Sequence, residues 1–367
     1  MIYILQIGLN NNPGGIENCI LNYHRFIDRS QFTFDYVDIY GKGLAYADEI
    51  VNLGGKIYSL PNYKRKPLFV LKELQLIFSQ NKYDIIHINI LSAANIIPIL
   101  IAYRSKATII VHSHNSSIPS GVLRKIMHKF NLKILQSLSV EKWACSLKAG
   151  KWMWGEEFLP QNVIPNAIDL EKFSRNICIR KKIRNKCGFK DTDVVIGFVG
   201  RFSEQKNVLF IPEILVELKR ISANFKLLLV GDGVLKEKLI KKIKDLHIEN
   251  EVFFAGIQTN VAEWYQAMDC FILPSLFEGL PIVGVEAQAA GLPCFVSNAI
   301  TKDLNITGTV QFLPTNQGSN IWAKLIYEGL GKKIKNTWLN KYSIKFAAQE
   351  LEKKYKKLFS EEGQERI

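Results

Sequence analysis

The first half of the chain alternates short apolar runs with longer segments in which apolar residues recur every three or four positions. Short runs of this kind are typical of buried strands, and the longer segments are typical of amphipathic helices. Strands that alternate with helices imply an α/β fold with a parallel sheet covered on both faces. The pattern predicts strands at residues 2–7, 34–39, 56–60, 85–90, 108–112 and 140–145.

The second half repeats the alternation after a short irregular segment. Residues 162–173 contain Pro165, Asn166 and Asp169, residue types that mark a connector between two regular regions. The tail at residues 343–359 predicts a helix with one apolar stripe. Strands are predicted at residues 194–200, 226–233, 252–256 and 270–273, a helix at residues 208–221, and the stripe of the tail consists of Ala347, Leu351, Tyr355 and Leu358.

Length and cysteine usage place the chain among intracellular proteins of two domains. A chain of 367 residues is too long for one core of the usual size. The six cysteines lack metal-binding spacing, which is typical of reduced thiols. The strand at residues 2–7 has no basic leader before it, and the longest apolar run, residues 93–103, is shorter than the roughly 20 residues that cross a bilayer. We therefore expect a cytoplasmic protein.

The net charge of +14 has three possible explanations: an anionic membrane surface, a nucleic acid, or simple solvation of the protein surface. No nucleic-acid-binding motif accompanies the charge, so nucleic acid is not the expected partner. Residues 120–138 instead predict a basic amphipathic helix, which can lie on an anionic bilayer such as the inner face of the plasma membrane. The alternative is an ordinary surface helix whose apolar stripe packs on the sheet. The stripe consists of Val122, Ile126, Phe130, Ile134 and Leu138.

Residues 274–293 carry the clearest chemical signal. Pro281 lies where a helix would begin, and Gly291 lies where it would end. This apolar helix is expected to be buried nearly all round, so the carboxylate of Glu286 needs hydroxyl or amide donors. Backbone N–H groups between Glu278 and Pro281 form an anion site at the positive end of the helix. An anion and a hydroxyl-bearing group side by side indicate a sugar nucleotide.

Two other loops at the carboxyl ends of predicted strands carry weaker signals. Arg201 and Lys206 follow the strand at residues 194–200, and their side chains could hold phosphate oxygens or be solvated loop cations. The glycines around Gly231 and in the stretch Gly14-Gly15-Ile16-Glu17 let a backbone approach a ligand, and plain turns are the alternative.

Two histidines end the predicted strand at residues 108–112. His112 and His114 lie where open α/β sheets place their sites. A pair of hydrogen-bonded loop histidines is the alternative interpretation. A zinc pair is not expected, because no third cysteine or histidine lies near them in the sequence.

These stretches together resemble a known enzyme family. The sequence FEGLPIVGVEAQAAGLP, in which Glu278 and Glu286 are separated by seven residues, resembles the Glu-x7-Glu signature of family-4 retaining glycosyltransferases of the GT-B fold. GRFSEQKN resembles the diphosphate-binding loop of that family, and residues 14–17 resemble its first glycine loop. The resemblance implies two Rossmann-like domains facing a cleft. Residues 1–165 with the crossover helix at 343–367 would bind the acceptor, and residues 166–342 would bind the donor.

The resemblance also implies a reaction: transfer of a hexosyl group from a nucleotide-diphosphate sugar, expected to be a UDP-sugar, to an acceptor hydroxyl with retention. Neither a metal nor a further cofactor is implied. His114, Arg201, Lys206 and Glu278 would be catalytic, and His112 is the alternative to His114 beside the sugar. The donor would be bound by Gly15, Gly200, Arg201, Lys206, Gly231, Leu280, Pro281, Ile282 and Glu286. Gly14, Ile16, Glu17 and His112 would lie on the acceptor side.

The resemblance is to enzymes of capsule and exopolysaccharide synthesis, which makes a lipid-linked oligosaccharide the expected acceptor and the inner membrane surface the expected location. Two other functions fit the same residues. A sugar-nucleotide epimerase of this fold would need no acceptor. A non-catalytic membrane-associated scaffold would bind liposomes without transferring or hydrolysing a donor.

Overall fold

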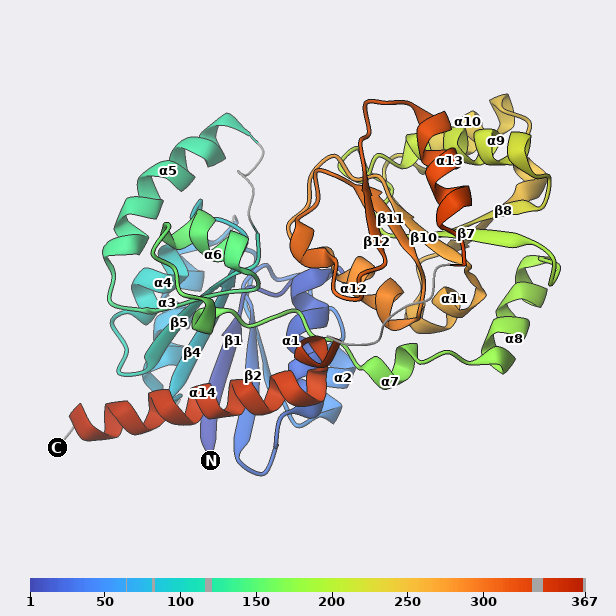
Figure 1. The fold of residues 1–367 in the computed structure, drawn as a ribbon. Coiled ribbons are helices and arrows are strands. Elements are labelled where there is room, and N and C mark those ends of the chain that lie inside the picture. Colours follow the sequence, from blue (N-terminus) through green and yellow to red (C-terminus); the bar gives the residue numbers. More distant parts are fainter. Residues whose placement is uncertain (64, 81–82, 116–120, 332–338, 366–367) are drawn as a thin grey trace. The chain divides into compact units, whose positions relative to one another are not determined.

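The computed structural model describes residues 1–63, 65–80, 83–115, 121–331 and 339–365 (Figure 1). The chain divides into two compact units. Residues 1–168 together with residues 341–367 form the N-terminal unit, and residues 169–340 form the C-terminal unit. The boundaries expected from the sequence lie after residue 165 and after residue 342.

In its described residues, the N-terminal unit builds one sheet of six parallel strands in the order β3-β2-β1-β4-β5-β6. The strand order reverses between β1 and β4, the switch point at which open α/β sheets bind their ligands. Each predicted strand of this half is present, with ends shifted by at most a few residues. The strands are β1 (Ile2–Ile7), β2 (Phe32–Asp38), β3 (Ile57–Ser59), β4 (Ile85–Ile90), β5 (Thr108–Ser113) and β6 (Glu141–Ala144).

Two hydrophobic clusters hold helices against the two faces of this sheet. Successive strand residues alternate between them, as the pleat requires: Ile4 belongs to one cluster and Leu5 to the other. The first cluster packs α1 and α14 on one face, and the second packs α3, α4 and α6 on the other. The helices are α1 (Gly15–Phe26), α2 (Ala47–Asn52), α3 (Pro67–Gln80), α4 (Ile97–Ala102), α5 (Val122–Ser137), α6 (Leu147–Trp154) and α14 (Ile344–Glu365).

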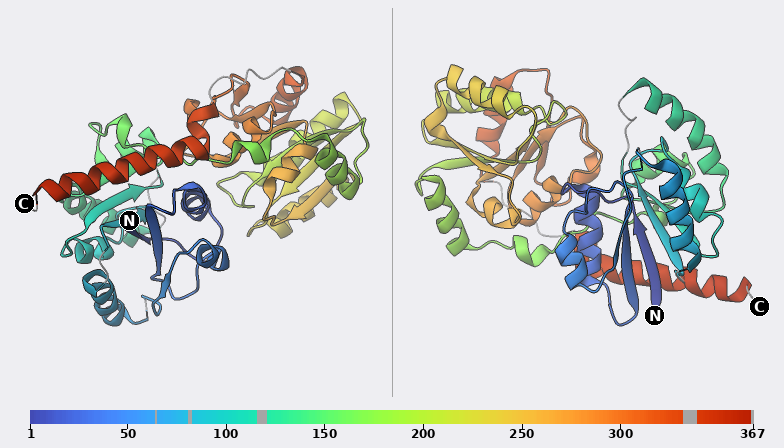
Figure 2. Two further views of the ribbon diagram at one scale, coloured as in Figure 1. Left: turned by 90° about the horizontal axis from the view of Figure 1, so that it is seen from below. Right: turned by 180° about the vertical axis from the view of Figure 1, so that it is seen from behind.

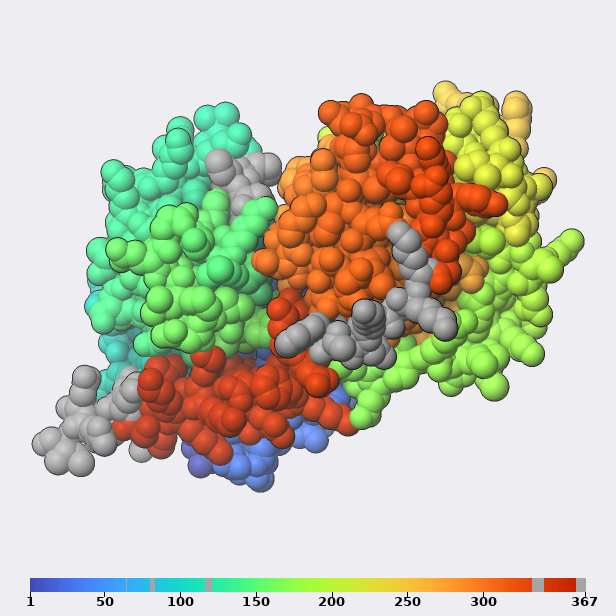
Figure 3. Space-filling view, viewed as in Figure 1, coloured from blue at the N-terminus to red at the C-terminus, as the bar shows by residue number. Residues whose placement is uncertain are grey.

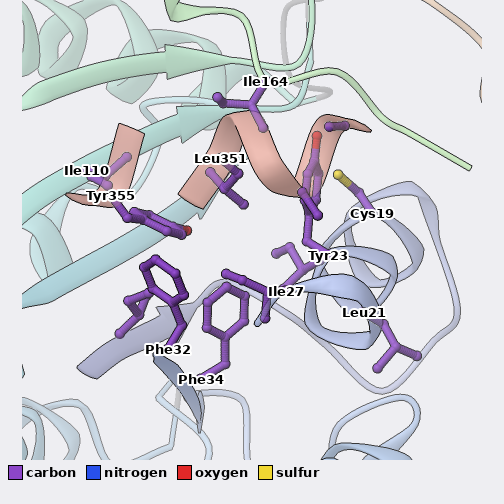
Figure 4. Packing of buried hydrophobic residues seen from close by; sticks show 14 of the residues in the cluster. Cys19, Leu21, Tyr23, Ile27, Phe32, Phe34, Ile110, Ile164, Leu351 and Tyr355 are labelled. Atoms are coloured by element: carbon purple, nitrogen blue, oxygen red, sulfur yellow. The ribbon is translucent and has the colours of Figure 1, made fainter. Parts of the chain in front are cut away.

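The C-terminal helix α14 lies across the N-terminal sheet beside α1 (Figure 2). The predicted apolar stripe is confirmed, because Ala347, Leu351 and Tyr355 are buried and Leu358 packs against the same cluster. Figure 4 shows Leu351 and Tyr355 directed toward the strand residues Phe32 and Phe34. The opposite side of α14 is exposed on the surface of this unit (Figure 3).

The described part of the C-terminal unit also forms one sheet of six parallel strands, in the order β12-β11-β10-β7-β8-β9. Its switch point lies between β7 and β10. The four predicted strands are present, and β11 and β12 were not predicted. The strands are β7 (Val194–Val199), β8 (Phe225–Val230), β9 (Val252–Gly256), β10 (Cys270–Leu273), β11 (Cys294–Ser297) and β12 (Val310–Leu313).

Helices follow each strand of the C-terminal sheet, and α9 packs against α13 while α11 packs against α7 and α8. The predicted helix at residues 208–221 begins as a short 3-10 helix, Val208–Phe210, before α9. The helices are α7 (Leu170–Phe173), α8 (Ile177–Cys187), α9 (Ile211–Ile221), α10 (Lys236–Asp245), α11 (Val261–Ala267), α12 (Ile282–Ala289) and α13 (Ser319–Gly329), and further 3-10 helices are Pro160–Asn162, Glu249–Glu251, Lys302–Leu304 and Leu339–Tyr342.

Helix α5 corrects one interpretation of the sequence. The stripe expected to pack on the sheet in a surface helix is exposed where α5 begins, since Val122 is 76% exposed and Phe130 is 69% exposed. The buried residues of α5 are His128, whose ring stacks on Trp152, and Leu135. Ile134 and Leu138 at the end of the stripe also pack against the second hydrophobic cluster, so only the first part of the stripe is left in contact with solvent. Ser120, the first residue of the predicted segment, lies outside the described residues.

Candidate functional site

Two loops flank the switch point of the C-terminal sheet, one after β7 and one after β10. Leu276 N–H donates to the carbonyl of Gln205 at 2.8 Å, and Gln205 Nε2 donates to the carbonyl of Phe277 at 3.1 Å. These two bonds fix the loop of residues 201–207 against the loop of residues 274–281. The side chains of Lys206 and Glu278 meet as a result.

Lys206 and Glu278 form the ion pair at this switch point. Lys206 Nζ lies 2.5 Å from Glu278 Oε1, and both side chains are largely buried. Glu278 thus fixes the side-chain conformation of Lys206. The ammonium group need not change rotamer to meet an anion at this position. Arg201, from the same loop, has an exposed side chain.

The glycines of the two central strand ends lie in close backbone contact. Gly231 has φ +134°, and a Cβ built on it would lie 2.0 Å from the carbonyl oxygen of Gly200. No residue with a side chain fits there. Gly200 N–H donates to the carbonyl of Val230, and Phe202 N–H donates to that of Asp232, so the loops after β7 and β8 are interlocked.

Helix α12 begins where the sequence predicted, with Pro281 as its N-cap and Ile282 as its first residue. Leu280 and Pro281 are thus placed at its positive end, where free backbone N–H groups favour an anion. Lys206 comes from the loop next to this helix start. The helix ends before Gly291, which has φ +79°.

Glu286 lies half-buried on α12, and its carboxyl has a hydroxyl partner. Tyr265 Oη lies 2.9 Å from Glu286 Oε2 and 3.1 Å from the carbonyl of Val283. One hydroxyl proton cannot serve both acceptors fully, but a protonated Glu286 would donate to the tyrosine while the tyrosine donates to Val283. Burial raises the pKa of Glu286 to about 7, and the hydrogen bond with Tyr265 opposes that rise.

In the N-terminal unit, the glycine loop after β1 leads directly into α1. Gly14 is the N-cap, and a Cβ on Gly15 would meet no atom within 4 Å. Ile16 and Glu17 are buried. Glu17 Oε1 accepts hydrogen bonds from Asn10 N at 3.1 Å and from Asn10 Nδ2 at 2.8 Å. Glu17 therefore shapes the loop of residues 8–14 from inside.

The two candidate histidines lie at the end of β5 with ring centroids 4.0 Å apart. His112 is buried, and its Nδ1 lies 3.2 Å from His87 Nε2. His114 is half-buried, and its Nε2 lies 2.9 Å from Asn89 Oδ1. Burial lowers the pKa of His114 to about 3 and that of His112 well below its ordinary value, so both rings are neutral at pH 7.

The structure thus gathers the predicted residues into two groups, one in each unit. Gly200, Arg201, Lys206, Gly231, Glu278, Leu280, Pro281, Ile282 and Glu286 lie at the carboxyl edge of the C-terminal sheet, and Gly14, Gly15, Ile16, Glu17, His112 and His114 lie at the carboxyl edge of the N-terminal sheet. Among the residues that the structure describes, no cluster of His, Cys, Asp or Glu suits a metal ion. The same residues contain no helix with the length and apolar character needed to span a bilayer.

Sequence reasoning missed several residues of these groups. Tyr265 lies in an amphipathic helix where nothing marks it as the partner of Glu286. Ser275 Oγ, two residues past β10, is buried without a hydrogen-bond partner in the described part of the chain. His87 and Asn89 carried a usable signal, since polar residues at alternate positions of an otherwise apolar strand share one face.

Comparisons with known proteins give the family and the relatives of this chain. Residues 179–306 match the model of a family described as glycosyl transferases group 1. A putative glycosyltransferase of Bacillus subtilis (strain 168), EpsF, is 29% identical over 333 residues, which cover 88% of this chain and 86% of that protein. The UDP-Gal:alpha-D-GlcNAc-diphosphoundecaprenol alpha-1,3-galactosyltransferase of Escherichia coli is 30% identical over 317 residues, or 81% of this chain and 79% of that enzyme.

Solved structures show the same architecture. The crystal structure of HepE from Anabaena in complex with UDP-glucose superposes with a TM-score of 0.69 over 99% of each chain, at 18% sequence identity. This likeness shows the fold, which is the GT-B fold expected from the sequence, built of two Rossmann-like parallel sheets.

Proposed function

The chain belongs to the family of glycosyl transferases group 1, and we propose that it transfers a hexosyl group from a nucleotide-diphosphate sugar to an acceptor hydroxyl with retention. The C-terminal unit binds the donor, and the N-terminal unit binds the acceptor. The single observation that carries the proposal is the junction of Lys206, Glu278 and the start of α12 at the switch point of the C-terminal sheet.

The diphosphate of the donor binds where positive charge converges. Lys206, Arg201 and the N–H groups at the start of α12 stabilise the charge that develops on the leaving diphosphate. Gly200 and Gly231 carry no side chains, so the nucleotide can approach their backbone closely. The carboxyl of Glu286 holds the ribose hydroxyls. No metal is needed, because the two cations and the helix supply the positive charge. A UDP-sugar is the expected donor, as in the HepE complex.

Transfer with retention proceeds on the front face of the sugar. The bond from the anomeric carbon to the phosphate oxygen breaks, and the bond to the acceptor oxygen forms on the same face. The acceptor's proton passes to the departing phosphate oxygen. Glu278 lies against Lys206 and Glu286 against Tyr265, so we assign neither carboxylate as a nucleophile. Within the C-terminal unit, Glu278 orients the transferred sugar. Within the N-terminal unit, we favour His114 over His112 as the sugar-facing histidine because His114 is the less buried of the two.

The acceptor is a lipid-linked oligosaccharide of surface-polysaccharide synthesis. The Escherichia coli relative is named for a diphosphoundecaprenol acceptor, and α5 exposes the apolar side chains that a bilayer would cover. Arg124, Lys125 and Lys129 are exposed on the same helix, and their charge favours the anionic inner leaflet. The enzyme is therefore cytoplasmic and peripheral on the membrane.

The test is turnover of Lys206→Ala and Arg201→Ala with UDP-sugars and a lipid-linked acceptor. Loss of a group that stabilises transition-state charge should lower kcat by roughly a hundredfold to a thousandfold. Lys219→Ala is the matched control, since Lys219 forms a 2.7 Å ion pair with Glu251 in the same unit, far along the chain from both loops. Turnover of Lys206→Ala equal to that of the control would refute the assignment. Incubation with donor alone separates transfer from epimerisation.

A further inference from the structure

One face of the N-terminal sheet carries a chain of polar side chains inside the hydrophobic cluster beneath α14. Gln6 interrupts β1, His87 and Asn89 interrupt β4, and His112 lies near the end of β5. Gln6 and His87 are paired in the strand register, and Asn89 is paired with His112. Tyr355 of α14 reaches this group from the hydrophobic cluster, since its hydroxyl contacts His87.

The chain of contacts has two branches. In the first branch, Tyr355 Oη lies 2.8 Å from His87 Nδ1, and His87 Nε2 lies 3.2 Å from His112 Nδ1. In the second, the side chain of Gln6 lines the same small cavity as Tyr355, and Gln6 Oε1 accepts from Asn89 Nδ2 at 3.0 Å. Asn89 Oδ1 then lies 2.9 Å from His114 Nε2.

The amide groups decide the direction of every bond in the second branch. Asn89 Nδ2 also lies 3.2 Å from the carbonyl of Ile7, so this atom is the donor and Asn89 Oδ1 is the acceptor. His114 must therefore donate from Nε2, which leaves a lone pair on its Nδ1.

The first branch then follows from Tyr355. His87 Nδ1 is its hydrogen-bond partner among the residues that the structure describes, so the hydroxyl proton of Tyr355 goes to that nitrogen. A neutral imidazole has one N–H and one lone pair, so His87 donates from Nε2 to His112 Nδ1, and His112 carries its proton on Nε2. Burial lowers the pKa of His87 to about 3, which keeps this ring neutral at pH 7 as well.

We propose that Tyr355 is a positioning residue that fixes the tautomers of His87 and His112, while Asn89 fixes that of His114. In the described part of the chain, the buried atoms His112 Nε2 and His114 Nδ1 have no hydrogen-bond partner. The network makes the first a donor and the second an acceptor, and a hydroxyl group can satisfy an acceptor of this kind. The role of His114 toward a sugar hydroxyl rests on the function proposed above, whereas the tautomers do not.

The experiment is nitrogen-15 NMR of the histidine rings in the full chain, in the wild type and in Tyr355→Phe. Ring nitrogen shifts separate a protonated from an unprotonated nitrogen, and the chain has only six histidines to assign. In the wild type, His87, His112 and His114 should each carry the proton on Nε2. In Tyr355→Phe, His87 and His112 should lose this single form, and kcat/KM should fall roughly tenfold, the effect of one hydrogen bond.

Tyr36→Phe is the matched control. Tyr36 is as fully buried as Tyr355 in the same cluster, and its hydroxyl lies 2.9 Å from His24 Nδ1, away from the network. This variant should change the ring signals of His24 alone and leave kcat/KM unchanged. Urea unfolding of both variants shows whether their losses of stability match.

Three outcomes would overturn the proposal. They are a wild-type proton on Nδ1 of His87, His112 or His114, unchanged ring signals in Tyr355→Phe, and an equal effect of Tyr36→Phe on His112. The first of these needs no variant, so it applies even if Tyr355→Phe does not fold. Wild-type protein with the expected ring signals and no transferase activity would instead count against the proposed function alone.

Discussion

Replacing Glu286 by glutamine should stabilise the free protein while weakening its hold on the donor. Burial raises the pKa of the Glu286 carboxyl from 4.5 to about 7 in the folded chain. Between these two values the folded state holds a proton that the unfolded state has released. The free energy of unfolding therefore falls as pH rises through this window.

The size of the effect follows from the shift. At about 1.36 kcal/mol for each pKa unit, ionised Glu286 costs the folded state at most roughly 3 kcal/mol at pH 8. A glutamine avoids that cost, because its amide can donate to Tyr265 while Tyr265 donates to the carbonyl of Val283. Glu286→Gln should thus gain stability over the wild type by roughly 2 kcal/mol more at pH 8 than at pH 5.

The assay is urea unfolding of both proteins without nucleotide at pH 5 and pH 8. Hydrogen exchange of the amides in β7 and β10 reports the opening of the C-terminal unit separately, since a chain of two units need not unfold in one step. Glu263→Gln is the control: Glu263 pairs with the exposed Lys182 at 3.7 Å, an interaction that contributes little to stability. A Glu286→Gln difference that does not grow with pH would refute the reasoning.

The remaining predictions test other parts of the structure. Glu286→Gln should also weaken UDP binding by roughly tenfold in calorimetry, since it removes a charged partner of the ribose hydroxyls, and unchanged affinity would exclude that contact. Gly231→Ala should destabilise the C-terminal unit by roughly 3 kcal/mol in urea unfolding, because its Cβ meets the carbonyl of Gly200. Ile126→Ser should weaken binding to anionic vesicles in flotation assays, whereas Ile177→Ser, at a similarly exposed site on α8, should not. Acidification from pH 7 to pH 5 should lower the protection factors of the amides in β4 and β5, taken relative to the intrinsic exchange rate at each pH, because His87 and His114 stay neutral in the folded chain but are protonated once unfolded.

The parallel sheets and most of their strands could be predicted because hydrophobic periodicity reports burial directly. The run Cys270–Leu273 and the helix that begins after Pro281 are cases in which the strand, the N-cap and the chemistry lie in one continuous stretch. The strands Cys294–Ser297 and Val310–Leu313 were missed. They are as short as Cys270–Leu273, but no chemical motif adjoins them to draw attention to so short an apolar run.

The residues of the site could be predicted only where the sequence of a single loop contains a recognisable motif. Glu278 and Lys206 were both singled out, but their contact depends on Gln205, whose bonds to the neighbouring loop have no counterpart in the local sequence. The need of Glu286 for a donor followed from its apolar helix. The identity of that donor, Tyr265, did not, because it is set by the packing of α11 on α12.

The helices α5 and α14 show that the tertiary contacts of an apolar stripe cannot be predicted from its sequence. A stripe of apolar residues at helical spacing states that one face of a helix favours burial, but it does not state what covers that face. In α14 the stripe is covered by the sheet, and its Tyr355 enters a polar network that no periodicity could reveal. In α5 only Ile134 and Leu138 of the stripe pack on the core, and Val122, Ile126 and Phe130 are exposed. Both helices present an apolar stripe at helical spacing, and only the tertiary contacts show how much of each stripe the core covers.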